Sequence, residues 1–598
     1  MDIPGKFPIS ILNCSKLQVL DLSYNQFVGN IPNDIDRLSN LREINLNSNH
    51  FSGNIPSSIG NLQYLQTLHL GNNLLTSFPP EIGNLSSLEY LYFYFNDFLP
   101  SKIPNEFIKL IKLRHLYMEK SNLYGEIPDW IGNYSNLEFL YLSENNLNGK
   151  IPENLFLLKN LTGVELYDNK LSGEIPREIE CLIMAGIDLS HNELTGSIPE
   201  GIGKLKYLSE LDMSNNRLTE EIPASIASLP LVTMIWLHQN NLSGELPIPF
   251  ANSGNFELRL NNNMLSGEIP FSFWSNGNLS YVSLNNNMFS GELPDKLNPA
   301  LRFLNLANNN FGGRLPTSFV SNPNLQILSL RSNRFNGSIP ENILHLQKLQ
   351  WLSLNNFSGH IPTRLGYLIG MINNSDTYLD TGDVQLATKG IMIPLDTMYN
   401  SSAVIDLSCN SFEANIPEEM GLLKLVSSLN LSHNHFSGNF PESIGNLSAL
   451  ESLDLSSNRL SGKIPQSLAT IDSLQVLNLS HNQLSGKIPV GAHFDTLSLD
   501  GLAFVGNDLL CVLPSDKVCE ADRNASADDV NPANEVDEVD RGDTEENLLL
   551  YAIAASGFVV GFWGLFFVLF MKKHKWWFPY WRFIDSVAVR ITVYVQKN

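Results

Sequence analysis

The stretch LEFLYLSENNLNGKIP at residues 137–152 follows the pattern LxxLxLxxNxLxGxIP, and LQVLNLSHNQLSGKIP at residues 474–489 follows it again. The pattern recurs about every 24 residues over most of the chain. Leucines that alternate at a period of two predict a short strand, and the buried side of such a strand is covered only by the neighbouring coil. The repeat therefore predicts a solenoid rather than a series of separate globular domains.

Each repeat contributes one asparagine, whose amide offers both a donor and an acceptor to backbone groups at the end of the strand. We expect these side chains to be buried and to form a ladder along the stack. Glycine followed by Ile-Pro predicts a bend and then an extended dipeptide, which leaves the convex side irregular or short-helical. With Ser121 in place of one asparagine we count 19 repeats, 15 before a break and four after it. The asparagines are Asn25, Asn49, Asn73, Asn96, Asn145, Asn169, Asn192, Asn216, Asn240, Asn263, Asn287, Asn309, Asn333 and Asn355, then Asn410, Asn434, Asn458 and Asn482.

Composition excludes several classes of function. The 598 residues carry a formal charge of −23, which disfavours a surface for nucleic acid. The 5 cysteines and the histidines never occur at zinc-ligand spacing, and no nucleophile elbow, P-loop or HRD and DFG pair of a kinase occurs. We therefore predict a protein that is not an enzyme and that needs no cofactor and no metal.

The LxGxIP segment resembles the leucine-rich-repeat ectodomains of plant receptors. We predict an α/β leucine-rich-repeat solenoid with a curved parallel β-sheet on the concave face, an irregular or 3-10 convex side, and one transmembrane α-helix. The predicted parts are repeats at 1–362 (15 plus a partial first coil), an island insertion at 363–401, four repeats at 402–496, a C-terminal cap at 497–519, an acidic juxtamembrane stalk at 520–547, a transmembrane helix at 548–571 and a short cytoplasmic tail at 572–598.

Outward positions on the strands are free to vary with a ligand, and aromatic side chains gather there in the fourth to seventh repeats. The alternative is that these tyrosines stack on one another across strands and protect the sheet. A second focus surrounds Trp236, and the small polar positions of the last four repeats suggest, by resemblance, a region that helps to dock a co-receptor. The predicted ligand-binding residues are Tyr90, Tyr92, Tyr94, Phe95, His115, Tyr117, Glu119, Phe139, Tyr141, Glu165 and Tyr167, with Trp236 and His238 in the second focus.

The break at 363–401 abandons the repeat, with a β-rich piece from Val384 to Ile393. It resembles the island of plant receptor-like proteins, where a triplet such as Thr388-Lys389-Gly390 precedes four final repeats. An insertion of this length is usually functional or disordered, and the alternative is a loop that only caps two stacked blocks. The repeat just before it, at LSLNNFSG, is about two residues short.

Several features predict an oxidising, extracellular compartment. By resemblance to the cap of these ectodomains, Cys511 and Cys519 are expected to form a disulfide. Asn-x-Ser/Thr sequons lie only before the predicted membrane segment, and Asn430 and Asn478 are on strands, so their occupancy is expected to be partial. The sequons are Asn13, Asn84, Asn133, Asn160, Asn241, Asn278, Asn336, Asn356, Asn373, Asn400, Asn430, Asn446, Asn478 and Asn524.

Residues 548–571 contain no charge, and Lys572, Lys573 and Lys575 follow them directly. This arrangement predicts a single-pass type I protein of the plasma membrane with a cytosolic C-terminus. Small residues at Gly557, Gly561 and Gly564 offer a face for close packing against a partner helix.

The start of the sequence departs from the resembled family. Residues 1–15 have neither the charge pattern of a signal peptide nor the paired cysteines of an N-terminal cap, so we expect an N-terminally truncated member. We predict a kinase-less receptor-like protein that recognises an extracellular peptide or protein and signals through a partner leucine-rich-repeat receptor kinase, in plant defence or development. The alternatives are a membrane-anchored or shed inhibitor of the polygalacturonase-inhibitor kind and a nonfunctional receptor fragment.

Overall fold

The computed structural model describes residues 3–247, 256–317, 322–373, 403–491, 497 and 501–511, and the backbone alone of 385–388 and 391–394. The chain divides into two units, Met1–Asp522 and Arg523–Asn598, and all described residues belong to the first. No helix in the described ranges is long and apolar enough to cross a membrane. The predicted transmembrane helix at 548–571, the stalk and the tail lie outside these ranges.

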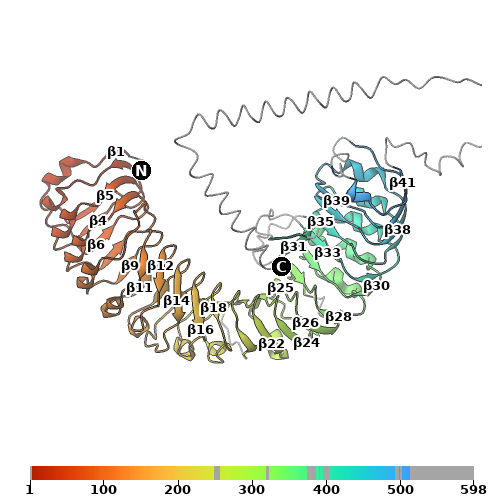
Figure 1. The fold of residues 1–598 in the computed structure, drawn as a ribbon, viewed down its shortest axis with the longest axis horizontal. Coiled ribbons are helices and arrows are strands. Elements are labelled where there is room, and N and C mark those ends of the chain that lie inside the picture. Colours follow the sequence, from red (N-terminus) through yellow and green to blue (C-terminus); the bar gives the residue numbers. More distant parts are fainter. Residues whose placement is uncertain are drawn as a thin grey trace, which may run out of the picture. The chain divides into compact units, whose positions relative to one another are not determined.

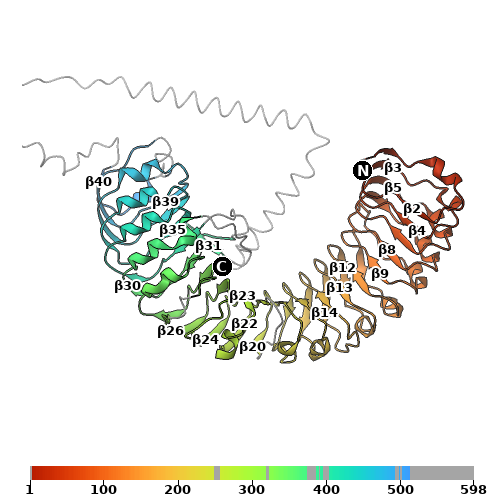
Figure 2. The ribbon, with the colours of Figure 1, turned by 180° about the vertical axis from the view of Figure 1, so that it is seen from behind.

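The first unit is a stack of coils that follow one another in sequence order (Figure 1), and the reverse view shows the same order (Figure 2). One strand from each coil joins a parallel sheet of 19 strands, one for each repeat counted in the sequence. The sheet is open, since among the described strands β2 pairs only with β4 and β39 only with β37. Its strands are β2 (Val19–Asp21), β4 (Glu43–Asn45), β6 (Thr67–His69), β8 (Tyr90–Tyr92), β9 (His115–Tyr117), β11 (Phe139–Tyr141), β13 (Gly163–Glu165), β15 (Gly186–Asp188), β17 (Glu210–Asp212), β19 (Met234–Trp236), β21 (Phe256–Arg259), β23 (Leu279–Ser283), β25 (Phe303–Asn305), β27 (Ile327–Ser329), β29 (Trp351–Ser353), β33 (Ala403–Asp406), β35 (Val426–Asn430), β37 (Ser452–Asp454) and β39 (Val476–Asn478).

The opposite side of most described coils is built from short helical turns, whereas the segments before β15 and β25 are irregular, and the sequence predicts both forms. Strands lie about 4.8 Å apart, whereas helical segments need about 10 Å, so the sheet takes the concave side of the curve. The helical elements are the 3-10 helices η1 (Ile9–Asn13), η2 (Ile35–Arg37), η3 (Ser57–Asn61), η4 (Pro80–Asn84), η5 (Asn105–Lys109), η6 (Asp129–Asn133), η7 (Leu155–Leu157), η8 (Glu200–Lys204), η9 (Ile226–Ser228), η11 (Glu341–His345), η12 (Thr363–Tyr367), η14 (Glu418–Leu422), η15 (Glu442–Asn446), η16 (Gln466–Thr470) and η18 (Leu502–Phe504), and the α-helices α1 (Phe271–Trp274) and α2 (Ile369–Ile372).

A second set of parallel strands, which the sequence analysis missed, runs through the LxGx segments. Gly149 shows why these segments contain glycine: its φ is +76°, and a Cβ there would lie 2.7 Å from Glu126 Cγ. The strands are β1 (Pro4–Lys6), β3 (Gln26–Gly29), β5 (His50–Asn54) and β7 (Leu74–Ser77); β10 (Tyr124–Glu126), β12 (Asn146–Gly149), β14 (Lys170–Glu174), β16 (Glu193–Gly196) and β18 (Arg217–Leu218); β20 (Ser243–Glu245), β22 (Met264–Glu268), β24 (Met288–Glu292), β26 (Asn310–Arg314) and β28 (Arg334–Asn336); β30 (Ser358–Gly359) and β34 (Ser411–Phe412); and β36 (Ser437–Asn439), β38 (Arg459–Lys463), β40 (Gln483–Lys487) and β41 (Leu509–Cys511).

The predicted asparagine ladder is present. Asn49 is typical: its Nδ2 donates to Leu22 O of the preceding coil at 2.9 Å, and its Oδ1 accepts from Phe27 N at 3.0 Å. Asn145 also spans the coil in which Ser121 replaces asparagine, because its Oδ1 accepts from Ser121 N and from Leu123 N. Each asparagine thus satisfies backbone groups of the coil before its own.

Two details of the ladder differ from the prediction. In the short LSLNNFSG repeat, Asn355 accepts from Ser332 N, whereas Asn410 accepts from Phe357 N across the break in the same way as the other asparagines accept from the preceding coil. In the predicted cap, Asn507 Oδ1 accepts from Leu484 N at 3.0 Å, so the ladder extends by one further asparagine that the pattern missed.

The predicted island begins too early. Helices η12 and α2 occupy 363–372, and Leu365, Leu368 and Met371 are buried in the same core as the repeats. These residues complete the convex side of the fifteenth coil, so the break starts after Ile372. Within it, β31 (Gln385–Thr388) and β32 (Ile391–Pro394) form an antiparallel hairpin over the stretch predicted to be β-rich.

Candidate functional site

The predicted ligand-binding residues lie on the outward side of neighbouring strands, in two columns. Register places Tyr90, His115 and Phe139 side by side in the first column. Register likewise aligns Tyr92, Tyr117 and Tyr141 in the second column. The column arises because residues separated by one repeat occupy equivalent positions on adjacent parallel strands.

The rings of the second column pack against one another. The centroids of Tyr117 and Tyr141 are 4.4 Å apart with the rings 14° from parallel, and those of Tyr92 and Tyr117 are 4.8 Å apart. Beyond Tyr92, His69 Nε2 hydrogen-bonds the Tyr94 hydroxyl at 2.9 Å. The cross-strand stacking that the sequence analysis held as the structural alternative is therefore present, and the rings remain only half-buried.

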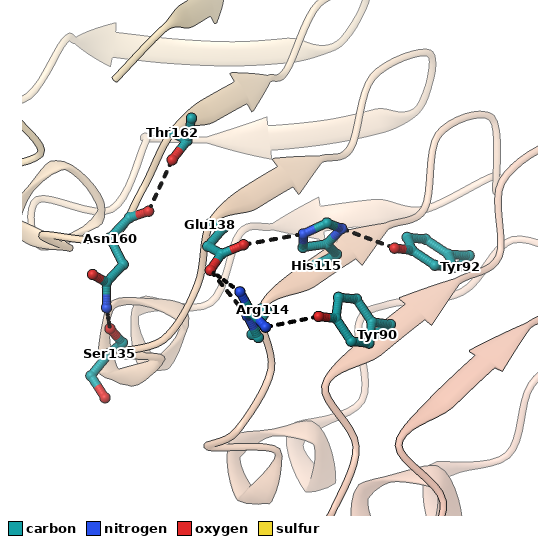
Figure 3. A network of polar contacts seen from close by, with 8 residues as sticks. All are labelled: Tyr90, Tyr92, Arg114, His115, Ser135, Glu138, Asn160 and Thr162. Atoms are coloured by element: carbon teal, nitrogen blue, oxygen red, sulfur yellow. Dashed lines mark hydrogen bonds and ion pairs between the residues drawn. The ribbon is translucent and has the colours of Figure 1, made fainter. Parts of the chain in front are cut away.

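A network of polar contacts fixes the first column (Figure 3). Arg114 donates through Nε and Nη2 to Glu138 Oε1, at 3.0 and 2.6 Å, and through Nη1 to the Tyr90 hydroxyl at 2.9 Å. His115 lies between Glu138 Oε2, 3.4 Å from its Nε2, and the Tyr92 hydroxyl, 2.9 Å from its Nδ1. Tyr90, Tyr92 and His115 are thus each oriented by a hydrogen-bond partner, which lowers the entropic cost of presenting them to a ligand.

The pKa values follow from this packing. Burial, reinforced by neighbouring tyrosines, raises the pKa of Tyr92 to about 12. Burial acts to raise the pKa of Glu138, but the hydrogen bond and charge of Arg114 outweigh it and lower this pKa. Burial lowers the pKa of His115 against the opposing effect of Glu138. Near neutral pH the network thus favours ionised Glu138 beside neutral His115.

Acidic groups flank the aromatic rings. Burial, with the charges of Glu165 and Glu144, raises the pKa of Glu119 to about 7, and its Oε2 is buried without a hydrogen-bond partner. Lys120 is 3.6 Å from Glu144 and 5.5 Å from the centroid of Phe95. Tyr167 donates to Glu144 at 3.5 Å.

The second focus has a centre that the sequence analysis missed. The guanidinium of Arg259 lies 4.3 Å from the Trp236 ring centroid and 4.4 Å from that of Tyr281, between the two rings. His238 lies just after the strand β19 that contains Trp236, and the ring centroids of the two residues are 6.5 Å apart. Arg259 lies between the two leucines of FELRLNNN at residues 256–263, so its outward position could have been read from the repeat, but its pairing with two rings depends on neighbouring coils.

Arg114 and Glu138 were also missed, because both precede the strand core of their repeats. Among the described residues, no group of three or more histidine, cysteine or acidic side chains is placed to hold a metal ion. Cys511 is disulfide-bonded, and its predicted partner Cys519 lies outside the described ranges. Cys14, Cys181 and Cys409 are free.

Most of the predicted glycosylation sites that the structure describes are exposed. Asn430 is not: it is 9% exposed, and its Oδ1 accepts from Ser432 N and Oγ. Asn278 and Asn478 are intermediate, whereas Asn400 and Asn524 lie outside the described ranges. The exposed acceptors are Asn13, Asn84, Asn133, Asn160, Asn241, Asn336, Asn356, Asn373 and Asn446.

Comparison with known proteins agrees with this geometry. The leucine-rich repeat region family matches residues 4–106, and leucine-rich repeat models match 424–484 and five segments between 136 and 346. The Arabidopsis receptor kinase HAESA, solved with the peptide hormone IDA and the co-receptor SERK1, is 35% identical over 87% of this chain and 86% of that one, with a TM-score of 0.71. The chain belongs to the leucine-rich-repeat family.

Other structures similar to this leucine-rich-repeat protein have the same character. PEPR1 in complex with AtPEP1 is 30% identical over 85% of this chain and 71% of that one, with a TM-score of 0.71. The ectodomain of the Arabidopsis thaliana membrane receptor kinase GASSHO1/SCHENGEN3, with CASPARIAN STRIP INTEGRITY FACTOR 2, is 31% identical over 86% and 67% of the two chains, with a TM-score of 0.58. No curated protein matches the chain. The described solenoid is thus similar to ectodomains of plant receptors.

Proposed function

We propose that this chain is a kinase-less, single-pass receptor-like protein of the plasma membrane that binds an extracellular peptide or protein. The aromatic patch, defined as Tyr90, Tyr92, Tyr94, Phe95, His115, Tyr117, Phe139 and Tyr141, is proposed as the main contact surface. Support comes from the oriented, half-buried rings on neighbouring strands, since large side chains held in place supply contact area at low entropic cost. Glu119, Glu165, Tyr167, Trp236 and His238 extend the proposed surface.

Signalling is proposed to pass through a partner receptor kinase, in plant defence or development. Among the similar structures, HAESA was solved with a peptide hormone and a co-receptor, and GASSHO1/SCHENGEN3 with CASPARIAN STRIP INTEGRITY FACTOR 2. The last four repeats support a partner-facing role through small, partly exposed side chains on their strands, such as Ser452 on β37. Small side chains allow a second surface to approach the sheet closely.

The test is replacement of Tyr92, Tyr94, Tyr117 and Tyr141 with alanine in the full-length chain. Secreted peptides and proteins are first screened for direct binding to the unaltered chain, and the hit is then titrated against the variant. We expect binding to be lost while the thermal unfolding midpoint stays within a few degrees. Tyr64 and Tyr207, which are 60% and 59% exposed and lie outside the sheet, are the matched control pair. Unchanged affinity in the four-tyrosine variant would reject the patch.

A further inference from the structure

Two glycines leave a hollow in the first column of the concave face. Next to Phe139 the column continues with Gly163 on β13 and Gly186 on β15, and then with Glu210 on β17. A pocket of about 240 Å³ lies over these strands, bounded by residues of β11 to β19. The Phe139 ring reaches over Gly163, where a Cβ would lie 2.8 Å from Phe139 Cδ1. A Cβ built on Gly186 would meet no atom within 4 Å, so the space above this residue is open.

The second column beside this hollow is acidic. Glu165, Asp188 and Asp212 occupy one register position on three successive strands, and Glu210 closes the pocket at the next position of the first column. The pocket lining contains no lysine, arginine or histidine among the described residues. Like charges placed directly opposite on neighbouring strands destabilise a sheet. Such an arrangement, held within a well-packed stack, is typical of a site whose compensating charge comes from a ligand.

Asp212 is the most buried of these acids, at 7% exposed. Its Oδ1 accepts from Ser214 N at 2.8 Å, and the Ser214 side chain also hydrogen-bonds this carboxyl group. The nearest cation that acts on it, Arg259, favours the ionised form less strongly than burial opposes it. The Ser214 hydrogen bonds and Arg259 together do not offset the cost of burying this charge, so a cation supplied by a ligand would be bound favourably.

The opposite wall of the pocket is aromatic. Phe139 and Tyr141 both line it, with ring centroids 5.8 Å apart and the rings at 74° to each other. Aromatic faces attract organic cations, and planar guanidinium groups also match carboxylates through two parallel hydrogen bonds. A metal ion would instead need several oxygen ligands converging on one point, and the described residues place no such group.

We propose that this pocket binds the guanidinium group of an arginine side chain on the peptide or protein ligand. The Asp188 and Asp212 carboxylates would accept its hydrogen bonds, and the Phe139 and Tyr141 rings would cover its apolar stem. The proposal rests on the proposed function, because it assigns a chemistry to part of the same ligand-binding face.

The test uses the purified full-length chain and two defined probes, the peptide Gly-Gly-Arg-Gly-Gly and the same peptide with citrulline in place of arginine. Citrulline keeps the shape of arginine but carries no charge. Ligand-observed NMR titration is expected to show binding of the arginine peptide at least about tenfold tighter than that of the citrulline peptide. Equal binding of the two peptides, or displacement of the arginine peptide by equimolar calcium ions, would overturn the assignment.

Variants locate the binding within the fold. Asp212→Asn and Asp188→Asn are each expected to weaken the arginine peptide about tenfold, and Gly186→Leu to abolish its binding by filling the hollow. Asp454→Asn is the matched control, because Asp454 occupies the equivalent register position on β37 and accepts from Ser456 N in the same way as Asp212 does from Ser214 N. A loss in the Asp454 variant equal to that in the Asp212 variant would contradict the proposal. If Gly186→Leu fails to fold, Gly186→Ala supplies the smaller filling.

The two proposals fail in different ways. If a screened ligand binds through the aromatic patch but is indifferent to Asp188→Asn and Asp212→Asn, the pocket assignment is wrong and the receptor function stands. If the arginine peptide binds in the pocket but the four-tyrosine variant keeps full affinity for the screened ligand, the pocket assignment stands and the aromatic patch is rejected.

Discussion

Asp212→Asn should stabilise this protein at neutral pH and not at acidic pH. Burial, reinforced by the charge of Asp188, raises the pKa of Asp212 from its ordinary value of 3.8 to about 6. A raised carboxyl pKa means that the folded state keeps a proton which the unfolded chain releases as the pH rises above about 4. The contribution of Asp212 to the free energy of unfolding therefore falls between about pH 4 and pH 6 and is constant above that window.

The size of the effect follows from the shift. Each pKa unit corresponds to about 1.4 kcal/mol, so ionised Asp212 costs the folded state at most about 3 kcal/mol. Asparagine removes the charge and keeps an oxygen that can accept from Ser214 N. The chain already shows this substitution elsewhere: Asn45 and Asn305, at the same register position, accept from Asn47 N and Ala307 N. The local turn is therefore expected to persist in the variant.

The assay is thermal unfolding of the full-length variant and of the unaltered chain at pH 4.5, 6.0 and 7.5. The midpoint difference should be small at pH 4.5 and should grow to its full value at pH 7.5. Burial also lowers the pKa of His69 to about 4, which destabilises the folded state in acid, but this contribution is common to both proteins and cancels in the difference. A midpoint difference independent of pH, or a variant less stable than the unaltered chain at pH 7.5, would refute the reasoning.

Three further predictions concern other parts of the molecule. Asn145→Ala should lower the local free energy of unfolding by about 3 kcal/mol or more, since Asn145 accepts from Ser121 N and Leu123 N and donates to Met118 O. Asn146→Ala, at an exposed position, should change this free energy by about 0.5 kcal/mol or less. Hydrogen exchange of residues 118–147 measures both effects. With a secretory signal peptide added, the chain should shift in electrophoretic mobility on glycosidase treatment. Asn160→Gln should reduce this shift, and Asn430→Gln should leave it unchanged because Asn430 is buried. A smaller shift in the Asn430 variant would contradict this prediction. Gly557→Leu combined with Gly561→Leu should weaken co-precipitation with a partner kinase, because the larger side chains block close approach of the two helices. Recovery of the same amount of kinase would show that these glycines do not contribute to the association.

The candidate site was predicted only in part, and the reason is visible in individual residues. Tyr117 and Tyr141 could be placed on one face because a repeat fixes which positions point outward. Arg114 could not, since its role depends on meeting Glu138 of the next coil and the Tyr90 hydroxyl of the previous one. Gly163 and Gly186 were passed over because a residue without a side chain carries no chemical signal, although the hollow they leave shapes the face.

The repeat pattern was enough to predict the solenoid, the number of coils and the asparagine ladder. These features are periodic and local, so the pattern of one repeat predicts the others. Alternating leucines define each strand, and one buried asparagine amide per coil hydrogen-bonds backbone groups of the neighbouring coil. Packing between coils, by contrast, sets the continuation of the fifteenth coil to Ile372, the hydrogen bond from Phe357 N to Asn410 across the break, and the alignment of three acids beside two glycines. Those features depend on which side chains meet across adjacent coils, about 24 residues apart in the chain and about 4.8 Å apart in the sheet.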